Sequence, residues 1–446
     1  MNNSIITEER LEKCRTQRVA TLKKRCGEVE KILCKDAADA LFDYYSIFDE
    51  GYYIWLASLW DPEIGGFYFS QSGRDAEGFL PDIESTVQAL RACETMGLMF
   101  GKSYAEAVSP KIKDTLIKFT KSLQDENGYF YHPQWGKNIA TPRRGRDLAW
   151  ATGLLEDFDE KPNYLPPSQT TEDGQKSAAL PEYLQSTEAF EKYLSEFDLR
   201  TRSYWIGNML QSQTGQIKAA GNEFVDILMN WFKEHQLPEN GLWQDVVNYD
   251  SVNGLMKISL IYSALGIELP NAKAGLRSAI QVALSDEPIT FICQVYNPFS
   301  VMSVILSNIS KFGSKSVTEQ LRKEITDNAA TLISITRQKV LIHKRPYGGY
   351  GYQPYNARMD TIKCSQCAPV SLGLPDDSDV NGGSISINGT TRCMCQALGI
   401  PVIPAFCDED AKLFHELLEN AKQYPKICKK PDWFDKYLFP EGTAWA

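Results

Sequence analysis

The stretch W-D-P-E-I-G-G-F-Y-F-S-Q-S-G-R-D-A-E-G-F-L-P-D-I-E-S-T-V-Q-A-L-R-A-C-E-T-M-G, residues 60–97, contains a pattern that the rest of the chain repeats. Gly65 and its glycine neighbour allow a tight turn before three aromatic residues. Asp82 is placed to cap a helix, and apolar residues recur every three to four positions from Ile83 to Gly97, a typical helix-ending residue. The stretch predicts an aromatic turn, a charged loop and a capped helix.

The composition is that of a soluble globular protein. The chain has 446 residues, 43% of them hydrophobic and 23% charged. Its net charge of −10 argues against nucleic acid or an anionic membrane surface as the main partner. No signal peptide or transmembrane run is recognisable, and the 11 cysteines are scattered. We therefore expect a cytoplasmic protein whose partner is a small molecule or an oligosaccharide, with no membrane insertion; its oligomeric state is left open.

Helical patterns follow one another along the chain without a convincing strand signal. Residues 159–182 are polar and contain several prolines, which predicts a surface loop or lid. Charged residues 8–34 predict one or two exposed helices with a solvated face. Further predicted helices are 111–123, one starting near Asp147, 201–215, 220–235, 250–266, 297–313 with Pro298 as first residue, and one long helix over 317–340.

The predicted helices repeat as hairpins. Such hairpins cannot bury their apolar faces alone and must stack on neighbours. The polar Gly-aromatic loops precede helices of one class, so they should gather at one end. We therefore predict an all-α fold, a closed (α/α)6 toroid over residues 35–446, with residues 1–34 as a helical extension. The helices of that class end near Gly97, Asp157, Gly215, Gly266, Gly313 and Gly399.

The Gly-aromatic turns resemble turns of the six-hairpin α/α-toroid families. One group of these families comprises α/α glycoside hydrolases and polysaccharide lyases. The other comprises terpenoid cyclases and protein prenyltransferases, whose repeats carry a Q-x-x-x-G-x-W/F turn. Gln124 to Phe130 matches that turn, whereas Gln236 to Trp243 is one residue longer. The turns that carry the resemblance are G-G-F (65–67), Q-D-E-N-G-Y-F (124–130), E-N-G-L-W (239–243) and G-G-Y (348–350).

Carboxylates lie in the loops that the toroid would bring to one end. Glycoside cleavage needs one carboxylic acid to protonate the leaving oxygen and a second group as base or nucleophile. Nearby aromatic residues raise a carboxyl pKa by desolvation, and arginine binds uronate carboxylates. We therefore expect a glycoside hydrolase of oligosaccharides, although each aspartate alone is explained as well by a helix cap. The candidate catalytic residues are Asp82, Glu84, Asp147 and Asp379, and the candidate substrate-binding residues are Arg74, Asp75, Trp135, Arg146, Trp243, Asp250, Asn253, Tyr350, Arg358 and Asp360.

A rival interpretation starts from Asp376-Asp377-Ser378-Asp379. Class II terpenoid cyclases protonate an alkene with an aspartic acid in a D-x-D-D motif, and D-D-S-D is similar but differs in order. The resemblance implies Asp377 or Asp379 as the proton donor. Two further alternatives remain open. One is a polysaccharide lyase using His132 beside its tyrosines, and the other is a helical-repeat binding scaffold without catalysis.

Cysteine spacing raises the question of a metal. Cys364-x-x-Cys367 and Cys393-x-Cys395 would make a Cys₄ zinc site. Against it, Cys393 and Cys395 do not easily face the same way on a helix, and cysteine is a common core residue. Magnesium on a D-D-x-x-D motif would require an acidic residue where Val380 stands. We therefore expect no cofactor and no metal ligands.

Overall fold

The fold is almost entirely helical, which confirms the all-α prediction. Its strands, among the residues described, are β1 (Trp60–Asp61) and β2 (Gly66–Phe67), an antiparallel pair across the first Gly-aromatic turn that pairs Trp60 with Phe67. The computed structural model describes residues 5–133, 136–138, 141–166, 181–356, 374 and 376–430.

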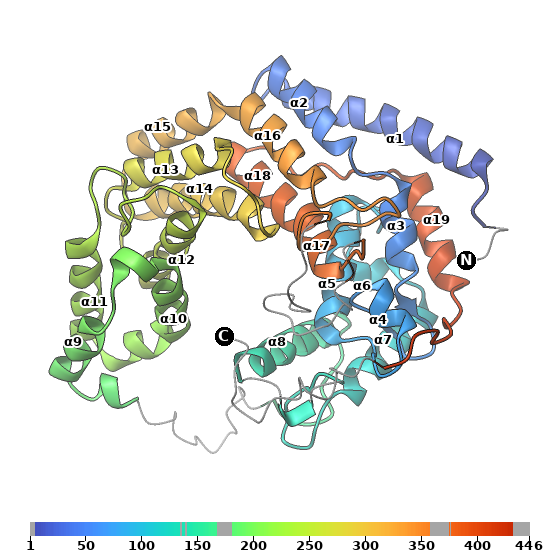
Figure 1. Cartoon of the computed structure of the whole chain (residues 1–446), viewed down its shortest axis with the longest axis horizontal. Coiled ribbons are helices and arrows are strands. Elements are labelled where there is room, and N and C mark those ends of the chain that lie inside the picture. Colours follow the sequence, from blue (N-terminus) through green and yellow to red (C-terminus); the bar gives the residue numbers. More distant parts are fainter. Residues whose placement is uncertain are drawn as a thin grey trace.

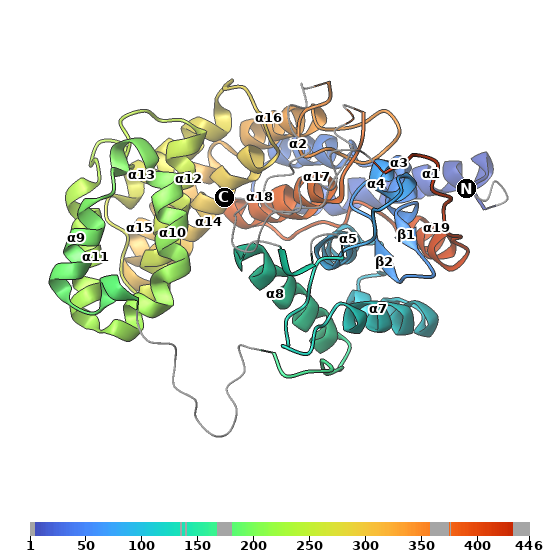
Figure 2. The ribbon, with the colours of Figure 1, turned by 60° about the horizontal axis from the view of Figure 1, so that its bottom comes forward.

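One layer of helices lines the inner side of an arc (Figure 1). Within it, α10 packs on α12, α12 on α14 and α14 on α18; α17 packs on α5, which packs on α8. The arc is open between α8 and α10 in Figure 1, and the same separation is visible in Figure 2. The inner elements are α5 (Ile83–Met96), α8 (Thr141–Asp157), α10 (Leu199–Ala220), α12 (Tyr249–Leu265), α14 (Cys293–Phe312), α17 (Val380–Ser384), a π-helix (Ile385–Thr390) and α18 (Thr391–Leu398).

Neighbouring inner helices run in the same direction. Asn297 donates to Asn253 near the starts of α14 and α12, and Asn308 donates to Ser263 near their ends. The same holds for α5 and α8. Glu84 pairs with Arg146 near both starts, whereas Tyr104, just beyond α5, bonds to the last residue of α8. The starts of the inner helices therefore share one end of the arc, as the repeat predicts for the candidate site.

The remaining helices cover the outside of this layer. The packed pairs include α13 with α14 and α16, α16 with α2, α7 with α8, and α11 with α9 and α10. The outer helices are α1 (Glu8–Val29), α2 (Lys35–Tyr45), α3 (Glu50–Ala57), α7 (Pro110–Ser122), α9 (Thr187–Ser195), α11 (Asn222–His235), α13 (Ala272–Leu284), α15 (Lys315–Thr326), α16 (Ala329–Leu341) and α19 (Asp408–Glu419); shorter elements are α4 (Gln71–Asp75), α6 (Tyr104–Ala107) and 3₁₀ turns at Gly136–Asn138 and Glu182–Leu184.

The Gly-aromatic turns share a conformation that only glycine adopts easily. In each, the glycine has a positive φ and the aromatic residue two positions later is buried. The glutamine side chains of two turns also make equivalent hydrogen bonds. Gln124 Nε2 donates to the carbonyl of Gly128 at 3.1 Å, and Gln236 Nε2 donates to that of Gly241 at 2.9 Å. The turn at Gln236, which is one residue longer, is therefore closed by the same glutamine–glycine hydrogen bond as the turn at Gln124. The glycines and their aromatic partners are Gly65 and Phe67, Gly128 and Phe130, Gly241 and Trp243, and Gly348 and Tyr350.

Three of these glycines pack closely against a helix elsewhere in the chain. A Cβ on Gly65 would lie 2.4 Å from the carbonyl oxygen of Thr115 in α7, and one on Gly241 would lie 2.2 Å from the amide of Gly275 in α13. A Cβ on Gly348 would lie 2.1 Å from the carbonyl oxygen of Gly51, in α3. The turn at Gly348 thus packs against α3, an early helix of the chain.

The N-terminal helix α1 packs on α2 and α19 through both apolar and charged groups. Arg18 is only 6% exposed and donates to Asp410 at 2.8 Å and to Glu50 at 2.6 Å. The apolar contacts of α1 come from its buried residues Cys14, Leu22, Cys26 and Val29. Part of the charge in this segment therefore forms a buried network and is not a solvated face.

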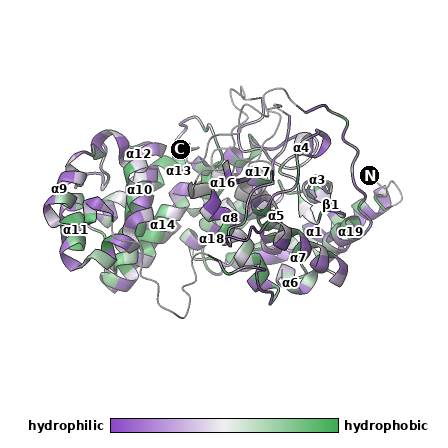
Figure 3. Ribbon diagram, turned by 90° about the horizontal axis from the view of Figure 1, so that it is seen from below, coloured by the Kyte–Doolittle hydropathy of each residue, from purple (hydrophilic) through white to green (hydrophobic). Residues whose placement is uncertain are grey.

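The predicted helix boundaries are correct for α5. Asp82 accepts from the Ser85 amide as N-cap, and Gly97 ends the helix in the left-handed conformation. Elsewhere along the helices, apolar and polar residues alternate, as Figure 3 shows for α10 and α11. Among the residues described, no helix is both long and apolar enough to span a membrane.

Three boundary predictions are wrong. The helix predicted over 201–215 does not end at Gly215, since α10 continues to Ala220. Residues 317–340 form two helices because Asn328 leaves helical geometry and its side chain donates to the carbonyl of Glu324. Pro298 is not the first residue of its helix, since α14 begins at Cys293. A proline in the second turn removes one amide, and the helix continues past it. The proposed loop or lid at 159–182 falls largely outside the described residues.

Candidate functional site

The start of α5 places two of the predicted carboxylates in the interior. Asp82 is 1% exposed, and its oxygens accept from the Ser85 amide at 2.9 Å and from the Ser85 hydroxyl at 2.5 Å. His132, itself 2% exposed, brings Nε2 to 4.0 Å from Asp82 Oδ2. The carboxylate of Asp82 therefore closes the first turn of α5 and holds a buried histidine nearby.

Helices α5 and α8 bring three more predicted residues together. Glu84, 1% exposed, forms an ion pair with Arg146 and also accepts from Gln88 at 2.9 Å. Asp147 follows directly in α8 and is completely buried. About a third of the Arg146 side chain is exposed, so the partner of the buried Glu84 carboxylate is itself in contact with solvent.

The start of α17 holds the second group of predicted carboxylates. Asp379 is 8% exposed and accepts from the amides of Tyr352 and Gly382, both at 2.6 Å. It therefore caps α17 and fastens the preceding turn to it. Asp377 is half-buried, and its Oδ2 accepts a hydrogen bond from the hydroxyl of Ser72.

Burial changes the acidity of both residues. Desolvation raises the pKa of Asp377 to about 7, and the charge of Asp379 adds to the rise. Desolvation likewise raises the pKa of Asp379 to about 6, against hydrogen bonds and the guanidinium of Arg345, which act in the opposite direction. Because Asp377 is the more exposed of the two, it is the carboxyl that combines a proton at neutral pH with access to solvent.

The charged loop 74–84 has a structural explanation that the sequence did not suggest. Arg74 is 8% exposed; it forms a two-point ion pair with Asp75 and donates to the carbonyl of Ser58. The segment after α19 lies across this loop, with the amides of Ile427 and Cys428 donating to the Asp75 carbonyl at 2.8 and 3.0 Å. The pair Arg74–Asp75 therefore belongs to a docking surface for the segment 424–430.

Two predicted binding residues lie on α12, on the other side of the arc. Asp250 is exposed and accepts from Gln244 at 3.1 Å. Asn253 is 4% exposed and its Oδ1 accepts from Asn297 at 2.9 Å. Lys257, one turn further along α12, is half-buried, and its pKa is lowered by desolvation and by the charge of Arg146. The charge of Arg146 in α8 therefore acts on Lys257 in α12.

Two aromatic residues proposed to bind substrate lie in the core instead of on a surface. Trp243 is completely buried, and its indole nitrogen donates to the Phe232 carbonyl at 2.8 Å. Tyr350 is also fully buried and donates to the Ile47 carbonyl at 3.1 Å. Direct contact with a substrate would require both to leave the core, so they support the turns. The predicted residues Trp135, Arg358 and Asp360 lie outside the described part of the chain.

The cysteine pattern is only partly covered by the structure. Cys364 and Cys367 lie outside the described residues. Cys393 and Cys395 are buried in α18, with the sulfur of Cys395 3.8 Å from the hydroxyl of Tyr45. Among the residues that are described, no group of three or more His, Cys, Asp or Glu side chains is placed to hold a metal ion.

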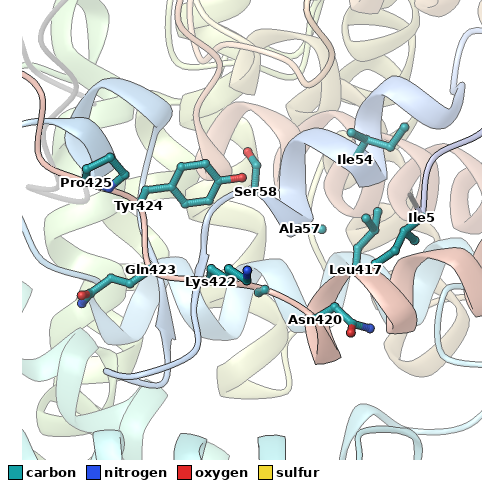
Figure 4. A pocket seen from close by; sticks show the side chains of 11 residues that line it. Ile5, Ile54, Ala57, Ser58, Leu417, Asn420, Lys422, Gln423, Tyr424 and Pro425 are labelled. Carbon is teal, nitrogen blue, oxygen red and sulfur yellow. The ribbon is translucent and has the colours of Figure 1, made fainter. Parts of the chain in front are cut away.

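A cavity of about 320 Å³ lies between α3, α19 and the segment that follows α19 (Figure 4). Ile54, Ala57 and Leu417 line its apolar part, and Tyr424 closes one side. None of the predicted catalytic carboxylates lines this cavity. The cavity is therefore separate from the candidate site at the helix starts.

Three residues of the Asp377 surroundings escaped the sequence reasoning. Ser72 bonds to Asp377, and Ser70 bonds to Ser72 at 3.1 Å. Arg345, 2% exposed, donates to the backbone carbonyl of Asp377 at 3.0 Å. Both serines stand in the stretch 60–97, but Ser72 lies 305 positions from Asp377, and no local pattern marks that contact.

No protein family, curated protein or solved structure matches this chain.

Proposed function

We propose that this chain is a glycoside hydrolase of oligosaccharides in which Asp377 donates a proton to the glycosidic oxygen. The observation that supports the proposal is a half-buried carboxyl whose pKa is raised by burial to about 7. A general acid works best when its pKa lies near the working pH, because it is then protonated and still acidic enough to give up the proton.

The reaction also needs an ionised partner. Glu84 faces the guanidinium of Arg146, which keeps its carboxylate paired with a cation, and Asp147 follows in the same helix. In the proposed reaction, Asp377 protonates the leaving oxygen, water attacks the anomeric carbon, and a carboxylate accepts the proton that the water loses. We propose Glu84 for that second role, with Arg146 at the substrate.

The architecture proposed with this function is an α/α toroid with the site at the turn end. Support comes from the parallel inner helices and from the contact between Gly348 and Gly51, which joins the last repeat to an early helix. In such an arrangement, the starts of α5, α8 and α17 would surround one end of a common centre, where an oligosaccharide would bind.

The test uses a panel of nitrophenyl glycosides and reducing-end-labelled oligosaccharides with the wild type and Asp377→Asn. The variant should hydrolyse natural glycosides more slowly than the wild type by about 10²-fold or more, which is the usual contribution of a general acid. Dinitrophenyl glycosides should be far less affected, because their leaving group needs no proton. Asp376→Asn, next to it and exposed, is the matched control. Full turnover of natural substrates by Asp377→Asn would refute the proposal.

A second candidate, a class II-type terpenoid cyclase, is favoured by the same carboxyl. Alkene protonation requires a neutral carboxylic acid, and the group with the raised pKa stands within Asp376-Asp377-Ser378-Asp379. Incubation with farnesyl and geranylgeranyl diphosphate, followed by gas chromatography of the extract, separates the candidates. Cyclic products that disappear in Asp377→Asn would select the cyclase.

A further inference from the structure

The carboxyl of Asp377 stands at the end of a short chain of hydrogen bonds. The amide of Gly73 donates to Ser70 Oγ at 3.1 Å, and Ser70 Oγ lies 3.1 Å from Ser72 Oγ. Ser72 in turn donates to Asp377 Oδ2. Ser70 and Ser72 are 0% and 8% exposed, so bulk water competes little for these bonds.

The backbone around Asp377 is held as firmly as its side chain. Arg345 donates to the carbonyl of Asp377 at 3.0 Å and to that of His343 at 2.9 Å. The hydroxyl of Ser378 donates to the carbonyl of Gly348 at 2.6 Å. The backbone of Asp377 is therefore held by Arg345 and by the turn at Gly348, and its carboxyl is held by Ser72.

Three charged groups surround this carboxyl. The charge of Asp379 raises its pKa, Arg345 donates to the backbone carbonyl of Asp377, and Asp376 is exposed next to it. Ser72 acts against burial because its hydrogen bond favours the ionised carboxylate. Burial and Asp379 therefore raise the pKa of Asp377, and the hydrogen bond from Ser72 lowers it. Removal of that hydrogen bond should change the protonation of the carboxyl.

We propose that Ser70 and Ser72 are positioning residues that hold the carboxyl of Asp377 in one orientation and stabilise its ionised form by hydrogen bonds. A hydroxyl that donates to a carboxylate favours the charged form over the neutral acid. This inference rests on the proposed function for its role in turnover. During transfer, the O–H bond of the Asp377 carboxyl breaks and its electron pair stays on Asp377, while the proton bonds to the leaving oxygen.

The test measures the ionisation of Asp377 directly, by ¹³C NMR of aspartate carboxyl carbons in the full chain, with Asp377→Asn to assign the signal. Ser72→Ala should raise the midpoint by about one pKa unit, the equivalent of one hydrogen bond to a charged group. It should also lower kcat more than it changes KM and move the alkaline limb of the pH profile to higher pH. Ser72→Thr, which keeps the hydroxyl, should restore both, and Ser70→Ala should produce a smaller shift in the same direction.

The control is Ser259→Ala, a buried serine of α12 whose hydroxyl donates to the Leu255 carbonyl of its own helix. It should leave the midpoint and the rate unchanged. If Ser72→Ala leaves the Asp377 signal unmoved, the positioning role is refuted even if the chain hydrolyses glycosides. If the signal moves as expected but no glycoside is turned over, the proposed function fails and the hydrogen-bond assignment stands.

Discussion

The guanidinium carbon of Arg74 lies 3.7 Å from the centre of the Tyr424 ring. Although the two residues are far apart in sequence, this contact holds the segment after α19 against α4 (Gln71–Asp75). The segment is also bound through its backbone, since Ala76 and Cys428 form a parallel bridge and the Glu77 amide donates to the Cys428 carbonyl. The charge of the loop therefore serves tertiary docking.

Replacing Tyr424 should loosen that segment. A cation–π contact of a partly buried arginine contributes about 0.5–2 kcal/mol, and Tyr424→Ala removes it. Hydrogen exchange at the amides of Ile427 and Cys428 should accelerate, because both donate to the Asp75 carbonyl. Tyr347→Ala, at a tyrosine that is 77% exposed, is the control and should leave these amides unchanged. Equal protection in Tyr424→Ala and wild type would contradict the docking role.

Breaking the buried ion network of α1 should be costly. Arg18→Met leaves Asp410, which is completely buried, without its cationic partner. Loss of one member of a buried pair typically costs about 3–5 kcal/mol. Arg10→Ala, in the exposed pair with Glu416, should cost less than about 1 kcal/mol. Urea unfolding of both variants measures the difference, and similar costs would show that the network adds nothing beyond a surface pair.

A side chain on Gly348 should disrupt the contact between repeats. Alanine there would place its Cβ 2.1 Å from the Gly51 carbonyl oxygen and would adopt a φ of +94°. We expect a loss of at least about 2 kcal/mol in the free energy of unfolding, from clash and left-handed strain together. Gly153→Ala, in α8 with no atom within 4 Å of the new Cβ, should be neutral or stabilising. Thermal unfolding of the pair decides, and an unchanged Tm for Gly348→Ala would contradict the model of turn packing.

Stability should depend on pH through Asp377. Its pKa is about 7 when folded and near 3.8 when unfolded, so the folded state binds more protons between these values. The contribution of this group is present in full below the unfolded pKa and is lost as pH rises through about 7. Each pKa unit of difference corresponds to about 1.4 kcal/mol.

Asp377→Asn removes this contribution, because the amide does not titrate. The Tm of the variant relative to wild type should therefore increase from pH 5 to pH 8. Asp376→Asn, whose carboxyl is exposed, should show no such trend. A Tm difference that is the same at both pH values would indicate that Asp377 is ionised throughout.

Local pattern was sufficient for much of the fold. The spacing from Ile83 to Gly97 predicted a helix because amphipathic period and caps are properties of neighbouring residues. The turn at Gln124 was found in the same way, since its glutamine, glycine and aromatic residue lie within seven positions. The break at Asn328 was missed because a polar residue within a helical pattern has no distinctive period.

The candidate site depended on contacts that no local pattern contains. By itself, the sequence determined the helices, the glycine turns and the carboxylates near helix starts, because these follow from short-range geometry. Only the tertiary structure decided what these residues contact. Arg74 packs against the distant Tyr424, Trp243 and Tyr350 are buried, and Ser72 bonds to Asp377. The acidity of Asp377 in particular comes from desolvation, and desolvation depends on which distant residues exclude water from a carboxyl.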